Sequence, residues 1–176
     1  EVSPFLRWAS TPAADVALPL LRFPPVRLAA MAGIELLRVS GTDLGRDAEE
    51  LSRVLDALPD VAARGAFSRT LRSVVDWRGQ VVTMLDRSYL AEAMSVLLVW
   101  GAHDAVIPVA HGYLAHEAMP GSRLEIFEDA GHFPHHQDPA RFLEILIGFI
   151  EGTEPNRFDR ARWRRLLRSG RPPVEA

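Results

Sequence analysis

The sequence predicts an α/β fold in which a helical region precedes a parallel strand–helix–strand–helix unit. A short apolar run over residues 96–100 is typical of a strand, residues 123–128 predict a second strand, and a helix-length segment over 108–119 separates them. Before residue 93 the apolar side chains instead recur at helical spacing. Two strands joined by a single helix should be parallel, so both are expected to end at the same edge of the sheet.

The first strand is predicted from an uninterrupted apolar run that stops at a glycine. Val96–Trp100 ends at Gly101, and such a run indicates a strand buried on both faces. Pro108 is expected to open the following helix, because its missing N–H costs nothing at a first helical position. The Pro120-Gly121 turn should end that helix.

An acid and an imidazole follow the two predicted strands. Asp104 comes three residues after Gly101, and His132 follows the second strand. A helix of about 11 residues climbs back roughly 16 Å, and a strand of about 6 residues returns by roughly 20 Å. Alone, Asp104 could be a turn residue and His132 a loop histidine. Their joint place at the carboxyl edge, where open α/β sheets hold their chemistry, favours a catalytic pair.

Two motifs around these residues carry a resemblance to a known family. The chain reads G-x-x-D-x-x-I-P over 101–108 and G-H-F-P-H over 131–135. This pattern resembles the C-terminal part of a bacterial α/β-hydrolase, a family whose chain order is nucleophile, acid, histidine. The resemblance implies that Asp104 is the triad acid and His132 the triad base, so the chain would be a partial α/β-hydrolase fold. We expect no cofactor.

The helical region before the first strand resembles the cap of that family. Residues 20–39 are apolar all round, 43–58 show helical spacing, and Asp60 is placed to cap a further helix. Residues 78–93 predict a loop and a short helix. The expected organisation is a helical cap over 1–93, the C-terminal part of the hydrolase core over 94–151, and an Arg-rich tail over 152–176.

The nucleophile is the part of the triad that the sequence does not supply. Two glycines stand four apart in Gly41-Thr42-Asp43-Leu44-Gly45, the G-x-D-x-G form of an Asp-nucleophile elbow. Only about 40 residues precede it, so we favour a turn between cap helices, with Asp43 or Asp47 capping the next helix. No serine lies in an elbow pattern. We therefore expect that the nucleophile half is missing and that the isolated chain is not a competent hydrolase.

The other histidines have simpler interpretations than catalysis. His132, His135 and His136 form H-x-x-H-H, but Pro134 breaks any shared helical face and no zinc-protease motif surrounds them, so we expect no metal site. Asp138 should cap the last core helix and Pro139 should open it. That helix is predicted to bury four apolar residues against the sheet: Phe142, Ile145, Leu146 and Phe149. We interpret three further histidines as surface or packing residues: His103, His111 and His116.

Composition narrows the classes of function. The net charge of −3 gives no general case for nucleic-acid binding. Cysteine is absent, which rules out disulfides and Cys-ligated metals. The first residues show no signal-peptide pattern, and no apolar run is long enough to cross a membrane. We therefore expect a cytoplasmic protein, with peripheral membrane contact as an open alternative.

The Arg-rich tail is the reason to keep peripheral membrane contact as an alternative. Seven Arg against three acidic residues give residues 152–176 a charge of +4, while residues 1–151 carry −7. Phe158, Trp163, Leu166 and Leu167 could form the apolar stripe of a basic amphipathic helix, suited to an anionic membrane or an acidic partner. A solvated tail is the simpler interpretation. The alternative function is thus a non-catalytic fragment or binding module with a membrane-directed tail.

The expected substrate is a small lipophilic ester or a related molecule. The cap is rich in Leu, Val, Phe and Met, which suits an apolar lid over the catalytic edge, although most such residues also pack against the core. The resemblance leaves ester, C–C, epoxide and carbon–halogen bonds open as the bond that is cleaved.

Overall fold

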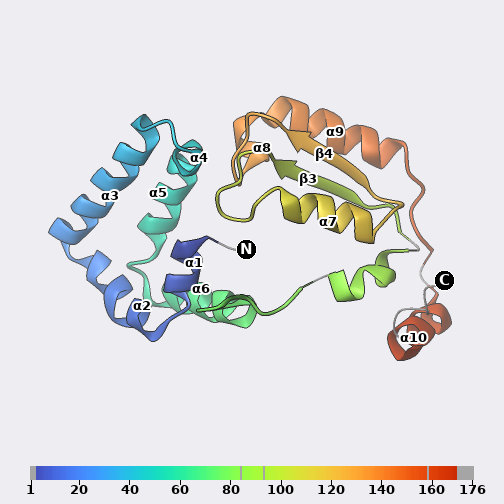
Figure 1. The fold of residues 1–176 in the computed structure, drawn as a ribbon, viewed down its shortest axis with the longest axis horizontal. Coiled ribbons are helices and arrows are strands. Elements are labelled where there is room, and N and C mark those ends of the chain that lie inside the picture. The colour runs from blue at the N-terminus through green and yellow to red at the C-terminus, as the bar shows by residue number, and fades with distance from the viewer. Residues whose placement is uncertain (1–2, 84, 93, 158, 170–176) are drawn as a thin grey trace.

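A run of helices leads into a two-stranded parallel sheet, and further helices follow the sheet (Figure 1). The structure is a computed structural model that describes residues 3–83, 85–92, 94–157 and 159–169. The first region contains α1 (Pro4–Ala9), α2 (Pro12–Ala17), the 3₁₀ helix η1 (Leu18–Arg22), α3 (Pro24–Val39), α4 (Asp43–Arg46), α5 (Ala48–Ala57) and α6 (Val61–Val74).

Helix starts in this region follow from proline and from polar caps. A proline opens α1, α2 and α3, where its missing N–H is tolerated. The side chain of Asp60 accepts a hydrogen bond from the Ala63 N–H at 2.7 Å, which confirms the cap predicted for α6. The apolar segment 20–39 is divided at Pro24, where η1 ends and α3 begins.

Two apolar clusters hold the helical region together. Ala9, Leu71 and Val75 join α1 to the end of α6. The second cluster joins α2, η1 and α5, and its buried members are Ala14, Leu18, Leu21 and Leu58. A separate cluster lies beneath the sheet, so the two parts of the fold have cores of their own.

The connection to the sheet contains a short hairpin and a 3₁₀ helix. Strands β1 (Val75–Asp76) and β2 (Gly79–Gln80) pair antiparallel, and η2 (Leu85–Ala91) follows. Gly79 takes a φ of +137°, a backbone conformation that favours glycine. The predicted short helix is present as η2. The hairpin was not predicted, because strands of two residues are too short to show alternation.

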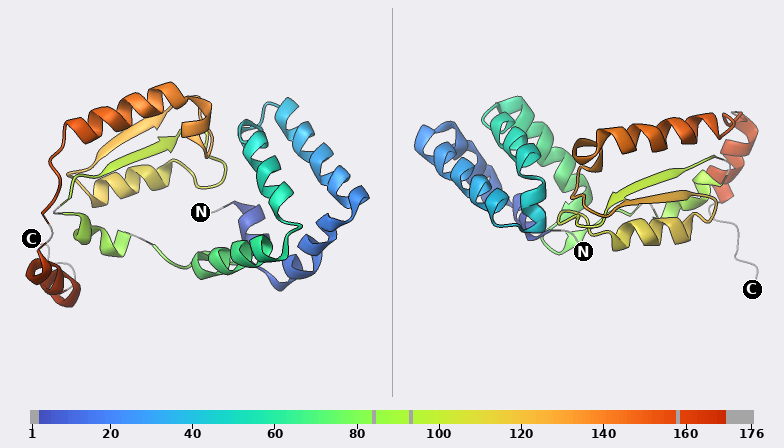
Figure 2. Two further views of the ribbon diagram at one scale, coloured as in Figure 1. Left: turned by 180° about the vertical axis from the view of Figure 1, so that it is seen from behind. Right: turned by 90° about the horizontal axis from the view of Figure 1, so that it is seen from above.

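The sheet confirms the predicted parallel pair. β3 (Leu97–Gly101) pairs with β4 (Arg123–Phe127) in a register that runs from Leu97 opposite Arg123 to Gly101 opposite Phe127. Helix α7 (Ala110–Ala118) connects the strands, and α8 (Pro134–Gln137) and α9 (Pro139–Glu151) follow. Figure 2 shows α7 and α9 on opposite faces of the sheet. Helix α7 begins two residues after the expected Pro108, whose carbonyl accepts the His111 N–H in a preceding turn.

Strand β3 is less buried than the sequence predicted. Residues 97–100 are only half-buried, and Gly101 alone in this strand is buried. Leu97 and Val99 pack with Phe127 and Ile145 on the α9 face. One helix covers each face, and a single partner strand flanks β3 within the described residues, which leaves part of each side chain open to water.

Helices α9 and α10 lie at the C-terminal end of the described residues. Asp138 accepts a hydrogen bond from the Arg141 N–H at 3.0 Å and Pro139 opens α9, as predicted. Part of the Arg-rich tail forms helix α10 (Arg160–Ser169), whereas a solvated tail was the simpler expectation; Phe158 and Arg171 lie outside the described residues. No helix in the described ranges is both long and apolar enough to cross a membrane.

Candidate functional site

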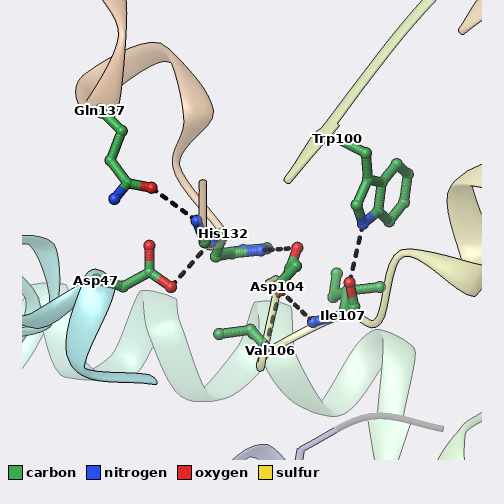
Figure 3. Close-up of polar contacts among 8 residues, drawn as sticks. Asp47, Trp100, Asp104, Val106, Ile107, His132 and Gln137 are labelled. Carbon is green, nitrogen blue, oxygen red and sulfur yellow. Dashed lines mark hydrogen bonds and ion pairs between the residues drawn. The ribbon is translucent and has the colours of Figure 1, made fainter. Parts of the chain in front are cut away.

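Asp104 is held at the carboxyl end of β3 by the backbone that follows it. Its Oδ1 accepts hydrogen bonds from the Val106 N–H at 2.8 Å and the Ile107 N–H at 2.7 Å (Figure 3). The residue is 9% exposed. The Trp100 indole N–H donates to the Ile107 carbonyl at 2.9 Å and ties this loop back to β3. The carboxylate is therefore fixed, with Oδ2 left for another partner.

That partner is His132, which follows β4. Its Nδ1 lies 2.8 Å from Asp104 Oδ2, so the structure brings the two predicted site residues together. An ionised carboxylate only accepts hydrogen bonds, so Nδ1 carries the proton and Nε2 is the nitrogen left for other chemistry. The hydrogen bond to Asp104 raises the pKa of His132 above its ordinary value, against the opposing effect of burial.

Main-chain contacts set the distance between the two loops. The Ala102 N–H donates to the Phe127 carbonyl at 2.9 Å, and the His103 N–H donates to the Ala130 carbonyl at 3.0 Å. A Cβ at Gly101 would lie 2.8 Å from the Ala130 carbonyl carbon and would contact the Gly131 carbonyl oxygen. Only glycine therefore allows the end of β3 to approach the His132 loop this closely.

The helical region contributes a third ionisable residue, Asp47. Its Oδ2 accepts a hydrogen bond from the His132 backbone N–H at 2.8 Å, across 85 positions of sequence (Figure 3). The residue is 3% exposed, and Oδ1 has no hydrogen-bond partner among the residues that the structure describes. Burial raises the pKa of Asp47, while the nearby N–H groups of His132 and Phe133 act in the opposite direction.

The structure corrects the expectation that Asp43 or Asp47 caps the next helix. Asp47 does occupy the position before α5, but its side chain makes no capping hydrogen bond to that helix. Asp43 lies in the first turn of α4 and likewise does not cap it, since Thr42 holds the cap position. The carboxylate of Asp47 points across to the His132 loop, which no local sequence signal indicates.

Residues around Asp47 make further polar contacts with the loops at this edge. Asp43 Oδ1 lies 2.9 Å from His103 Nδ1, and Arg46 donates to the Asp129 carbonyl at 3.0 Å. Glu50 Oε1 lies 3.2 Å from His136 Nδ1. We refer to residues 43–50 as the contact segment. It touches the loop after β3, the loop after β4 and helix α8.

Gln137 is a second residue whose role the sequence did not indicate. Its side-chain oxygen accepts a hydrogen bond from the Gly131 N–H at 2.7 Å. The two consecutive N–H groups of Gly131 and His132 are therefore both held by side chains, one from α8 and one from the contact segment.

The Gly41–Gly45 sequence does not form a nucleophile elbow. An elbow follows a strand, whereas this sequence follows α3. Gly41 takes a φ of +69°, and Gly45 packs against the backbone of Leu37, where a Cβ would lie 2.9 Å from the carbonyl carbon. Gly41 thus serves the expected tight turn between helices, and Gly45 lets α4 pack closely against the end of α3.

The remaining histidines make packing or polar contacts. The His135 ring packs on His136, with ring centroids 4.3 Å apart, and also contacts Phe142. His116 Nδ1 lies 2.8 Å from the Ser122 hydroxyl. Within the described ranges, no group of three or more His, Asp or Glu side chains is arranged to hold a metal ion.

Mycobacterial proteins match almost the whole chain. An uncharacterized protein of Mycobacterium tuberculosis is 51% identical over 172 residues, which cover 97% of this chain and 50% of that protein. A Mycobacterium bovis protein, also uncharacterized, matches to the same extent. The chain thus spans about half the length of these relatives.

A more distant relative has a named activity, and a family model covers most of the chain. A Neisseria meningitidis protein named pimeloyl-[acyl-carrier protein] methyl ester esterase is 33% identical over 98 residues, or 54% of this chain and 30% of that protein. The model described as the alpha/beta hydrolase family matches residues 2–145. Because this match covers most of the chain and the two strands of the sheet are parallel, the chain belongs to the α/β-hydrolase family.

Proposed function

We propose that Asp104 and His132 are the acid and base of a hydrolase catalytic triad whose nucleophile is not among these 176 residues. One observation carries the proposal. The buried Asp104 carboxylate, fixed by two backbone N–H groups, lies 2.8 Å from His132 Nδ1. This is the geometry in which a carboxylate orients an imidazole and stabilises it once it is protonated.

The chemistry follows from the two ring nitrogens. With Nδ1 bonded to Asp104, Nε2 of His132 accepts the proton of a serine nucleophile, or of a water if the nucleophile is an aspartate. The sequence contains no serine in an elbow motif, and Gly41–Gly45 follows a helix, which supports a nucleophile from elsewhere. The isolated chain would therefore hold and orient a base without supplying the attacking group.

The helical region over residues 1–93 is proposed as the cap of this hydrolase. Its apolar clusters are separate from the cluster beneath the sheet. The contact segment lies against the two loops that carry Asp104 and His132, which is where a cap would close over a substrate. Residues 94–151 would then be the C-terminal part of the core, and 152–176 the tail.

A carboxylic ester with a lipophilic group is the substrate class we favour. The Neisseria relative is named as an esterase, which supports an ester bond over the alternatives. Helix α3 leaves Leu28, Leu36 and Val39 between 63% and 72% exposed, an apolar surface suited to a lipophilic molecule.

The test has two stages, and the first uses the purified chain. We expect it to hydrolyse p-nitrophenyl butyrate no faster than buffer. Activity that His132→Ala abolishes would show that a nucleophile lies within these residues. Asp43 would then be the first residue to replace.

The second stage supplies the other half of the fold. A chimera joins the part of the Mycobacterium tuberculosis relative that this chain does not match to the present 176 residues, with the intact relative assayed alongside. If the chimera is active, we expect His132→Ala and Asp104→Asn to remove most of the activity. His116→Ala is the matched control, because His116 bonds Ser122 beside the amino end of β4, away from the site. Equal activity in all three variants would contradict the proposal.

Helix α10 supports a second candidate function, attachment to an anionic membrane surface. Its five arginines are all exposed, and Leu167 is 64% exposed. Such a helix can bind lipid headgroups through Arg while an apolar side chain enters the interface. The chain should pellet with phosphatidylserine-containing vesicles and not with phosphatidylcholine vesicles, and replacing Arg160, Arg164 and Arg168 by Gln should weaken that binding. Equal pelleting with both lipids would contradict it.

A further inference from the structure

We propose that Asp47 is a positioning residue that fastens the main chain of His132 to the helical region, so that the placement of that region determines the orientation of the imidazole. The catalytic consequence rests on the proposed function, whereas the positioning itself does not. Asp47 acts through the backbone and touches no reacting atom, so it is distinct from the acid–base pair.

The first argument is that the hydrogen bond to Asp47 comes from the main chain of the candidate catalytic histidine. Asp47 Oδ2 accepts from the backbone N–H of His132 itself, at 2.8 Å. The imidazole of the same residue is held at its other end by Asp104. One carboxylate therefore fixes the backbone and another fixes the ring, and the two come from different parts of the fold.

The second argument is steric. A Cβ at Gly131 would lie 2.6 Å from Asp47 Oδ1 and 2.7 Å from its Cγ. The carboxylate thus lies directly against the backbone of the residue before His132. Because Gln137 also accepts a hydrogen bond from the Gly131 N–H, side chains hold two consecutive residues of the loop.

The third argument is that the arrangement is unfavourable for a residue with only a structural role. Asp47 is 3% exposed, yet its Oδ1 has no hydrogen-bond partner among the described residues. A carboxylate at the start of a helix would ordinarily bond the free N–H groups of that helix, and Asp47 does not. A buried, incompletely paired acid beside a histidine is the kind of group that marks functional sites.

Other residues of the contact segment also connect the helical region to the loops around His132. Asp43, Arg46 and Glu50 each contact a different element at the same edge, and Asp47 lies at their centre in the chain. A displacement of α4 and α5 would therefore move the His132 backbone along with the other loops.

The experiment follows His132 by NMR in the 176-residue chain, where no hydrolysis is needed. Three variants are compared with the wild type: Asp47→Ala removes the acceptor, Asp47→Asn keeps an oxygen acceptor, and Asp43→Ala is the matched control from the same segment. The readouts are hydrogen exchange of the His132 amide, the Nδ1–H signal of its ring, and the titration of that ring.

We expect Asp47→Ala to speed exchange of the His132 amide at least tenfold and to weaken or shift the Nδ1–H signal. Asp47→Asn should restore both readouts toward the wild type, and Asp43→Ala should change neither. Faster amide exchange with an unchanged Nδ1–H signal would overturn the positioning role, as would no change at all. The ring titration should shift in both Asp47 variants, because each removes the Asp47 charge that raises the pKa of His132.

A direct measurement covers the case in which Asp47→Ala does not fold. In the labelled wild-type chain, a scalar coupling through the hydrogen bond should link the His132 amide nitrogen to the Asp47 carboxylate carbon. Its absence, with the amide exchanging as fast as exposed loops, would overturn the proposal. Because neither readout involves turnover, a failure here is distinguishable from a failure of the proposed hydrolase function.

Discussion

Replacing Gly131 by Ala should destabilise the fold through one identified collision. The added Cβ would lie 2.6 Å from Asp47 Oδ1 and 2.7 Å from Cγ, closer than carbon and oxygen atoms can pack. Asp47 is 3% exposed and cannot swing into water without moving the loop. Overpacking of this kind costs about 1–3 kcal/mol. Gly131 is not among the glycines with positive φ, so backbone strain does not add to that cost.

Urea denaturation followed by circular dichroism provides the assay, with Gly148→Ala as the matched control. A Cβ at Gly148 meets nothing within 4 Å, and Gly148 lies inside helix α9. Alanine there should stabilise the chain by about 0.5–1 kcal/mol. The two glycine-to-alanine substitutions should therefore change the free energy of unfolding in opposite directions.

A double-mutant cycle tests the cause. Asp47→Ala removes the atoms that the new Cβ would meet, so the cost of Gly131→Ala should shrink by about 1 kcal/mol or more in that background. Neighbouring residues typically couple by about 0.5–3 kcal/mol, whereas independent sites add to within about 0.5 kcal/mol. Additive effects would refute the collision with Asp47 as the reason for the destabilisation.

Three further predictions concern the charges at the site and a helix cap. Asp104→Asn should lower the pKa of His132, which an NMR titration of the ring will measure, because the hydrogen bond that His132 donates to Asp104 is the largest cause of the raised pKa. The folded-state pKa values of His132 and Asp47 are both raised, so the stability that each contributes should fall as pH rises, for Asp47 from 3.8 upward and for His132 from 6.5 upward. Asp47→Asn should remove the part of this decline that begins at pH 3.8, as measured by urea denaturation at several pH values. If the free energy of unfolding of the variant falls with pH as steeply as that of the wild type, Asp47 is not the cause of that part of the decline. Asp138→Ala should cost about 1 kcal/mol through loss of the α9 cap. The exposed Glu144→Ala on the same helix should stay within about 0.5 kcal/mol of the wild type in the same denaturation assay.

The pairing of Asp104 with His132 could be predicted from sequence because it depends on topology. Two parallel strands of similar length end at one edge, so residues just beyond their ends meet whatever the detailed packing is. The caps at Asp60 and Asp138 were predictable for a related reason, since each bonds an N–H three residues away.

The role of Asp47 could not be predicted, because its partner is 85 positions away. Its local sequence is that of a helix cap, and it does occupy that position. The direction of its carboxylate depends on how the helical region packs against the sheet. The spacing of apolar residues in the sequence does not indicate that packing. The degree of burial of β3 was missed for the same kind of reason, because burial depends on the neighbours that cover a strand.

The close approach at Gly101 has a consequence for engineering. The spacing of the acid and the imidazole depends on backbone groups touching backbone groups, through Ala102 with Phe127 and His103 with Ala130. Side chains of the apolar cluster beneath the sheet take no part in these contacts. A designer could therefore exchange Leu97 or Ile145 for residues of similar volume to alter thermal tolerance while the acid–imidazole distance stays constant, whereas any side chain at Gly101 would lengthen it.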